Sequence, residues 1–193
     1  VNMRGIGTDN ASVMTGIDNG VYRKLKELAP HLILVKCVCH SLQLAVSNAA
    51  KDFMPRNLEF IIRETYSWFS HSAYRQTQYK SLFNTMNEGH EPLKIVQSCN
   101  TRWLSVESAV NRIFEQWYEL KAHFDVARQS EKCYTAELLY NMYKDKVNYV
   151  YLCFLKPILA DIQSVNKAFE SQKADPSKLF KDLLILLTSL VHK

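Results

Sequence analysis

The first forty residues place two apolar segments on either side of one helix, and this order constrains the fold more than any other feature of the chain. Val1–Gly7 is short, partly apolar and followed by a polar turn at Thr8–Asn10, so we interpret it as the end of a strand. His31–Val38 is a nearly continuous apolar run rich in β-branched residues, which predicts a buried strand. Between them Val21–Leu28 has helical spacing of apolar residues, and Pro30 ends that helix. Two strands joined through a helix are expected to pair in parallel.

The rest of the chain has the apolar spacing of helices almost throughout. One apolar stripe consists of Leu58, Ile61, Ile62, Thr65 and Phe69, and another of Tyr79, Leu82, Phe83 and Met86. We expect helices at 41–51, 58–69, 79–86, 106–124 and 179–190, the last after Asp175 as N-cap and Pro176 as first helical residue. A further helix should run from Thr135 to Pro157 and kink or stop there. The aromatic residues Tyr134, Tyr140, Tyr143, Tyr149, Tyr151 and Phe154 are assigned to the helical core by their spacing.

These patterns predict an α/β segment followed by an all-α segment. Residues 1–52 have the order strand–helix–strand–helix, and residues 53–193 are helical. A helical block placed directly after two strands indicates an insertion into an α/β core or a second layer upon it. The chain also begins without Met inside an expected strand, so we expect it to be an internal piece of a longer protein.

Composition and net charge give only weak information about the binding partners of the chain. The chain carries a formal net charge of +5 without a long basic run, which modestly favours an acidic partner such as nucleic acid. Five cysteines without a secretory signal favour a reducing, intracellular setting. No window has the roughly 20 apolar residues that a membrane span requires, so no membrane partner is expected.

The first candidate motif is Gly5–Ala11, which carries Asp9. An acidic residue at the C-terminal end of a central strand lies where open α/β sheets place ligands and catalytic groups. Its carboxylate oxygens are ligands that Mg²⁺ accepts, usually together with substrate phosphates. The alternative is an aspartate that stabilises a turn before the next helix.

The second motif is Cys37-Val38-Cys39-His40, at the end of the second expected strand. His40 is a candidate active-site residue because the parallel order directs it toward Asp9. A zinc site would need a second ligand pair at defined spacing, and Cys99 is a poor candidate. The alternative is two small buried cysteines and a histidine that begins a helix.

The third motif is Thr101-Arg102-Trp103-Leu104-Ser105, at the start of a long helix. Arg102 offers a phosphate contact and Trp103 a plane on which a base can stack. The alternative is a tryptophan packed on the helical core beside a solvated arginine.

Taken together and in this order, the motifs resemble the hAT superfamily of DDE transposases. The likeness extends to about residue 125, and beyond it the chain matches only in being helical. The matching residues are Gly7–Met14, Gly20-Val21, Leu25-Lys26, Pro30-His31, Cys37–His40, Leu42 and Thr101–Ser105.

The resemblance implies an RNase H-like core in residues 1–52, interrupted by a helical insertion domain in residues 53–193. It further implies that three carboxylates bind two Mg²⁺ or Mn²⁺ ions for DNA cleavage and strand transfer. Asp9 matches the second carboxylate, Cys37 and His40 match a Cys-x-x-His signature beside the active site, and Trp103 matches a residue that stacks on a flipped base.

The departures from the family pattern lie at both ends of the chain. The first aspartate should precede Val1 and the glutamate should follow Lys193, and the N-terminal zinc finger and C-terminal dimerisation segment are missing. One carboxylate of three should hold no metal, so we expect this chain to be inactive alone.

Two hypotheses about function follow from the resemblance. The first is a fragment of a nuclear transposase whose parent binds, cuts and joins DNA and assembles through the missing dimerisation segment. The second is a domesticated, catalytically inactive derivative that acts as a DNA-binding or regulatory protein. The flanking sequence would discriminate them, since only the first requires the other two carboxylates.

Overall fold

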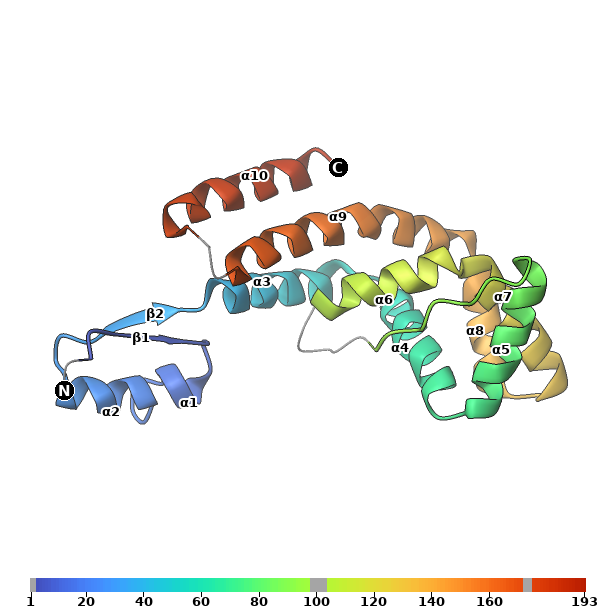
Figure 1. Cartoon of the computed structure of the whole chain (residues 1–193), viewed down its shortest axis with the longest axis horizontal. Helices are drawn as coiled ribbons and strands as arrows, with labels where there is room; N and C mark the ends of the chain where they lie inside the picture. Colours follow the sequence, from blue (N-terminus) through green and yellow to red (C-terminus); the bar gives the residue numbers. More distant parts are fainter. Residues whose placement is uncertain (1–2, 98–103, 172–174) are drawn as a thin grey trace.

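The computed structural model describes residues 3–97, 104–171 and 175–193. Figure 1 shows a small strand-containing unit at one end of an elongated assembly of helices. The elements in chain order are β1 (Gly5–Thr8), α1 (Ser12–Thr15), α2 (Val21–Leu28), β2 (Ile33–Lys36), α3 (Val38–Phe53), α4 (Arg56–Ser70), α5 (Ala73–Met86), α6 (Leu104–Glu115), α7 (Trp117–Ser130), α8 (Tyr134–Lys144), α9 (Lys146–Glu170), η1 (Pro176–Lys178) and α10 (Leu179–Val191).

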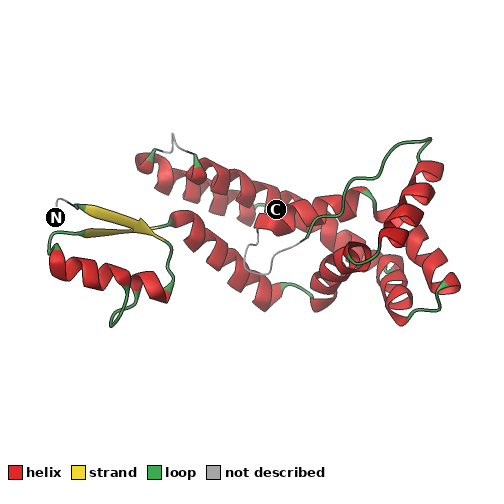
Figure 2. Cartoon of the chain, turned by 60° about the horizontal axis from the view of Figure 1, so that its bottom comes forward, coloured by secondary structure: helices red, strands yellow, loops and turns green. Residues whose placement is uncertain are grey.

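The two strands pair in parallel, as the sequence predicted. Gly5 is in register with Ile33 and Thr8 with Lys36. The helices α1 and α2 lie along one face of this sheet (Figure 2). The expected order of strands and helices followed by an all-helical block is therefore confirmed. Within the described ranges the sheet has only these two strands, and the RNase H-like core stays a prediction.

The expectation that the second strand is buried is wrong. Ile33 is 64% exposed and Val35 is 59% exposed, whereas Leu32, just before the strand, is only 1% exposed. Successive side chains of a strand point to opposite faces, and among the described elements helices cover only one face of this sheet. The apolar run therefore forms a strand with one open apolar face.

The helix α3 begins directly after β2 and joins the sheet to the helical block. It starts at Val38, earlier than the expected Ser41, so that Cys37 becomes its N-cap residue. The backbone N–H of Cys37 still donates to the carbonyl oxygen of Thr8 at 2.9 Å, which continues the strand pairing up to the helix. One uninterrupted helix thus extends from the sheet edge to Phe53.

The core of the helical block is formed mainly by α4, α6, α7, α8 and α9. The expected stripe on α4 is confirmed, because all five of its residues are buried. On α5 only Tyr79 and Phe83 are buried, and Met86 is 47% exposed. The most deeply buried apolar side chains of the block include Leu58, Ile61, Val110, Ile113, Leu120, Phe124, Leu139, Tyr143 and Leu152.

The single long helix expected at 106–124 is wrong, because the chain breaks at Gln116 between α6 and α7. Gln116 is 1% exposed, and its side chain makes hydrogen bonds in place of those that the helix backbone loses at the break. Its Nε2 donates to the carbonyl oxygens of Leu93 and Arg112, each at 3.0 Å. Its Oε1 accepts a bond from the Tyr79 hydroxyl at 3.1 Å. The apolar periodicity continues across the break, which is why the pattern did not reveal it.

The helix expected from Thr135 to Pro157 is also divided, but at a different place. It breaks at Asp145, whose carboxylate accepts a bond from the Val147 backbone N–H at 2.9 Å and so caps α9. Pro157 lies inside α9, which continues to Glu170. The expected stop at Pro157 is therefore wrong, and Leu152 before the proline and Leu159 after it are both buried.

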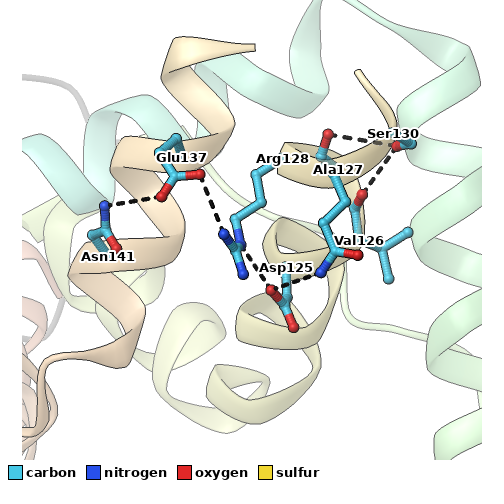
Figure 3. Close-up of polar contacts among 8 residues, drawn as sticks. Asp125, Val126, Ala127, Arg128, Ser130, Glu137 and Asn141 are labelled. Atoms are coloured by element: carbon cyan, nitrogen blue, oxygen red, sulfur yellow. Dashed lines mark hydrogen bonds and ion pairs between the residues drawn. The ribbon is translucent and has the colours of Figure 1, made fainter. Parts of the chain in front are cut away.

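The helices α7 and α8 form a hairpin that Arg128 links (Figure 3). Its guanidinium donates to the carboxylates of Asp125 at 2.7 Å and Glu137 at 3.4 Å. The same guanidinium lies 4.1 Å from the ring centroid of Tyr140. A partly buried arginine with two carboxylates and an aromatic ring fixes the relative position of the two helices.

The expected cap Asp175 precedes the short helix η1, whereas the N-cap residue of α10 itself is Lys178. Asp175 Oδ1 accepts from the backbone N–H of Ser177 at 3.0 Å. Farther along, Ser189 and Lys193 both donate to a carboxylate oxygen of Asp161 at 2.6 Å. These contacts place the end of α10 over the middle of α9, as Figure 1 shows.

The aromatic residues between Tyr134 and Phe154 are only partly in the core. Tyr143 is 1% exposed, but Tyr134 is 78%, Tyr151 41% and Phe154 52% exposed. The assignment of these last three to the core is wrong. They lie on parts of α8 and α9 that no other described element covers completely.

Candidate functional site at the strand ends

The parallel pairing brings the first two sequence motifs to the same edge of the sheet. Asp9 directly follows β1, and Cys37 directly follows β2, with His40 in the first turn of α3. The side chain of Asn10 donates to the Ser41 hydroxyl at 3.0 Å and so links the two motifs. The expected placement of Asp9 and His40 at the same strand ends is therefore confirmed.

Asp9 has a structural role in this arrangement. Its side chain is exposed, and Oδ1 accepts a bond from the backbone N–H of Ala11 at 3.2 Å. This contact is an Asx turn, which sets the path from β1 into α1. The alternative role given to Asp9, stabilising a turn before the next helix, is therefore confirmed. The other carboxylate oxygen has no partner in the described part of the chain and is open to solvent.

The cysteines of the second motif differ in exposure. The alternative of two small buried cysteines is wrong for Cys37, which is exposed at the N-cap position of α3. Cys39 is half-buried, and its Sγ lies 4.0 Å from the Asn166 carbonyl oxygen of α9. Burial raises the pKa of the Cys39 thiol, and the neighbouring Cys37 and Glu170 raise that pKa further. Cys39 therefore stays a protonated thiol at neutral pH.

The end of α9 contributes two residues that the sequence did not indicate. Asn166 is 1% exposed and donates to a carboxylate oxygen of Glu170 at 2.7 Å, next to Cys39. The Asn166 Oδ1 atom is buried without a partner in the part of the chain that the structure describes. Asn166 and Glu170 lie near Cys39 because α9 packs on α3. A local sequence pattern does not predict packing between helices that are distant in the chain.

The described residues do not form a site for two metal ions. Among them no group of three His, Cys, Asp or Glu side chains is placed to hold a metal. Asp9 supplies one carboxylate, whereas Mg²⁺ in a two-ion site needs further oxygen ligands. Asp9 could therefore hold the Mg²⁺ or Mn²⁺ that the resemblance implies only together with carboxylates other than those of the described residues.

The helix α3 begins at this edge of the sheet, and the N-terminal end of a helix carries a partial positive charge. The first turn of α3 carries no acidic residue, and the Cys37 side chain makes no capping bond. The first backbone N–H groups of a helix lack partners within it and attract anions such as phosphate. A phosphate group near His40 would meet this helix end.

Arg102 and Trp103 lie outside the described residues. The helix α6 begins at Leu104, so the third motif does lead into a helix of the helical block, as expected. The buried side chains of Val106 and Val110 anchor that helix in the core.

None of the protein families, curated proteins and solved structures compared with the chain matches it. Within residues 3–97, 104–171 and 175–193, no helix combines the length and apolarity needed to cross a bilayer.

Proposed function

We propose that this chain is part of a hAT-type transposase-like protein whose parent binds DNA and carries out metal-dependent cleavage and strand transfer. The observation that supports the proposal is the parallel strand pair, which brings Asp9 and the Cys37-x-x-His40 motif to one edge. An all-helical block follows directly, in the order that the resemblance implies.

In this proposal Asp9 is one of three metal-binding carboxylates, and the others come from segments of the parent outside residues 1–193. His40 and the first turn of α3 lie beside the DNA phosphate in this proposal. Arg102 and Trp103 bind DNA from the helical block by a phosphate contact and base stacking. The chain alone holds no catalytic metal and is inactive. The parent would act in the nucleus, where its DNA substrate lies.

A second candidate function is a domesticated, catalytically inactive protein that binds DNA or regulates. The Asx turn favours this candidate specifically. Because Asp9 stabilises the turn into α1, the residue has a reason to persist after catalysis is lost. The presence of Asp9 alone therefore does not discriminate the two candidates.

The test compares DNA cleavage by the full-length parent and its Asp9→Asn variant in Mg²⁺ or Mn²⁺. Asparagine keeps an oxygen that accepts from the Ala11 N–H, so the turn persists while the negative charge is removed. We expect cleavage to fall by about a hundredfold or more, with folding and DNA binding retained. Asp18→Asn, at an exposed turn position, is the matched control and should cleave normally.

Two outcomes would reject the enzyme hypothesis. Full activity of Asp9→Asn would show that Asp9 binds no catalytic metal. An inactive wild-type parent that still binds DNA would support the domesticated protein. Trp103→Ala should weaken DNA binding in either case, because base stacking contributes about 1–3 kcal/mol per base.

A further inference from the structure

The helices α3, α9 and α10 enclose an apolar groove of 680 Å³, with α4 at one end. Val46 and Phe53 of α3, Phe154 and Ile158 of α9, and Leu187 and Leu190 of α10 are among the residues that line it. None of the lining residues carries a charge. A groove without charge does not fit a polyanion, so this surface is not where DNA would bind.

The apolar surface continues along α9 beyond the groove. A second hollow is lined by Lys146 together with four apolar residues, Val147, Val150, Tyr151 and Phe154, and it shares the last two with the groove. These four side chains are 58%, 63%, 41% and 52% exposed. Their spacing of three and four residues places them on one stripe of α9, of the kind that packs against another helix.

The outer side of α10 forms a ridge next to the groove. Phe180, Leu184, Leu187 and Val191 are spaced by four, three and four residues and form one stripe. They are 77%, 53%, 60% and 80% exposed. Leu187 belongs to both the ridge and the groove wall, so the two surfaces are continuous.

We call this combined surface the α9–α10 face: the groove, the α9 stripe and the α10 ridge. Its most exposed members are Phe53, Val147, Val150, Tyr151, Phe154, Phe180, Leu184, Leu187 and Val191. These nine side chains are 41–85% exposed, and a large aromatic side chain has roughly 150–250 Å² of surface in all, so together they present on the order of 900 Å². This area exceeds the patches usual on monomers and matches the roughly 800 Å² per partner of a stable interface.

We propose that the α9–α10 face binds a second copy of this chain in a twofold-symmetric dimer. A twofold interface uses the same patch on both copies, so the patch must complement itself. The α9–α10 face meets this condition because it holds a ridge and a groove side by side. The α10 ridge of one copy packs against the groove and α9 stripe of the other, and the reverse contact follows by symmetry. This dimer is independent of the proposed DNA chemistry.

The test measures the mass of the 193-residue chain by sedimentation velocity and light scattering over a concentration series. We expect the wild type to have twice the chain mass of 22.4 kDa. Phe154→Glu and Leu187→Glu each place a charge in the contact, and each should weaken dimerisation at least tenfold. Both residues are already more than half exposed, so the monomer should keep its fold, as circular dichroism would confirm.

Val126→Glu is the matched control, because Val126 is 56% exposed on α7, outside the α9–α10 face. This variant should dimerise like the wild type. A wild type that stays monomeric at high concentration would overturn the proposal and assign the face to another segment or partner. A dimer that withstands both Phe154→Glu and Leu187→Glu would overturn it as well, because the contact would then lie elsewhere.

Discussion

The buried histidine of the helical core should make the stability of the fold depend strongly on pH. His123 is 3% exposed, and its Nε2 accepts a hydrogen bond from the Trp68 indole N–H at 3.0 Å. If Nε2 were protonated, its N–H and the indole N–H of Trp68 would be two donors facing each other with no acceptor between them. The Arg75 guanidinium, 3.5 Å from the Trp68 ring centroid, adds a positive charge nearby. Glu131, paired with Arg75 at 2.7 Å, offsets this only in part.

These surroundings lower the pKa of His123 from 6.5 to about 4, with burial as the main cause, opposed by Glu131 and reinforced by Arg75. Because the folded pKa is the lower one, the unfolded chain binds more protons between these values. Stability is therefore full above pH 6.5 and falls as the pH is lowered toward 4, below which this group adds no further loss. At 1.36 kcal/mol per pKa unit, the loss is about 3 kcal/mol.

The assay is urea unfolding of the 193-residue chain at a series of pH values, followed by circular dichroism. Other acids and histidines also titrate in this range, so the informative quantity is the difference between the wild type and His123→Gln. Glutamine can accept the Trp68 bond but does not titrate. Between pH 7 and 4 the wild type should lose about 3 kcal/mol more than this variant.

His31→Gln is the matched control, because His31 is exposed, and its pH profile should follow that of the wild type. Identical pH profiles for the wild type and His123→Gln would refute the reasoning. They would mean that His123 accepts a proton in the folded state at little cost.

Two further predictions concern the breaks and irregularities of the helices. Gln116→Met should lower the free energy of unfolding by about 2–3 kcal/mol, because it removes the bonds that hold the α6–α7 break, whereas the exposed Gln129→Met should change it little. Pro157→Ala should raise the free energy of unfolding by about 1–3 kcal/mol, because alanine supplies the N–H that bonds to the Cys153 carbonyl inside α9. Chemical unfolding would check both, and an unchanged Gln116→Met or a destabilised Pro157→Ala would contradict them.

Local patterns predicted the elements that depend on short-range chemistry. The parallel order of the strands followed from a single helix between two apolar runs, and the α4 stripe followed from its spacing. The same logic placed Asp9 and His40 at one edge, because parallel strands end on the same side. Asp175 was identified as a cap from its position before a proline.

The patterns failed where tertiary contacts decide the outcome. The break at Gln116 depends on Tyr79 and Leu93, which are distant in sequence, and the apolar periodicity continues through it. Pro157 was expected to end a helix, but a local rule cannot include the packing that holds α9 together. The exposure of Ile33 likewise depends on which face of the sheet is covered by helices, and this cannot be predicted from the residue type.

The helix α3 runs without interruption from the sheet edge to the helical block, so its length sets the orientation of one relative to the other. Because β2 passes into α3 at Cys37 without a loop, the orientation of everything beyond Phe53 is tied to the strand end by helical pitch. Each residue of an α-helix turns the chain by about 100° and advances it by about 1.5 Å. A one-residue deletion within α3 would therefore rotate the helical block by more than a quarter turn relative to Asp9. Insertions and deletions should be tolerated in the loops of this protein but not between Val38 and Phe53.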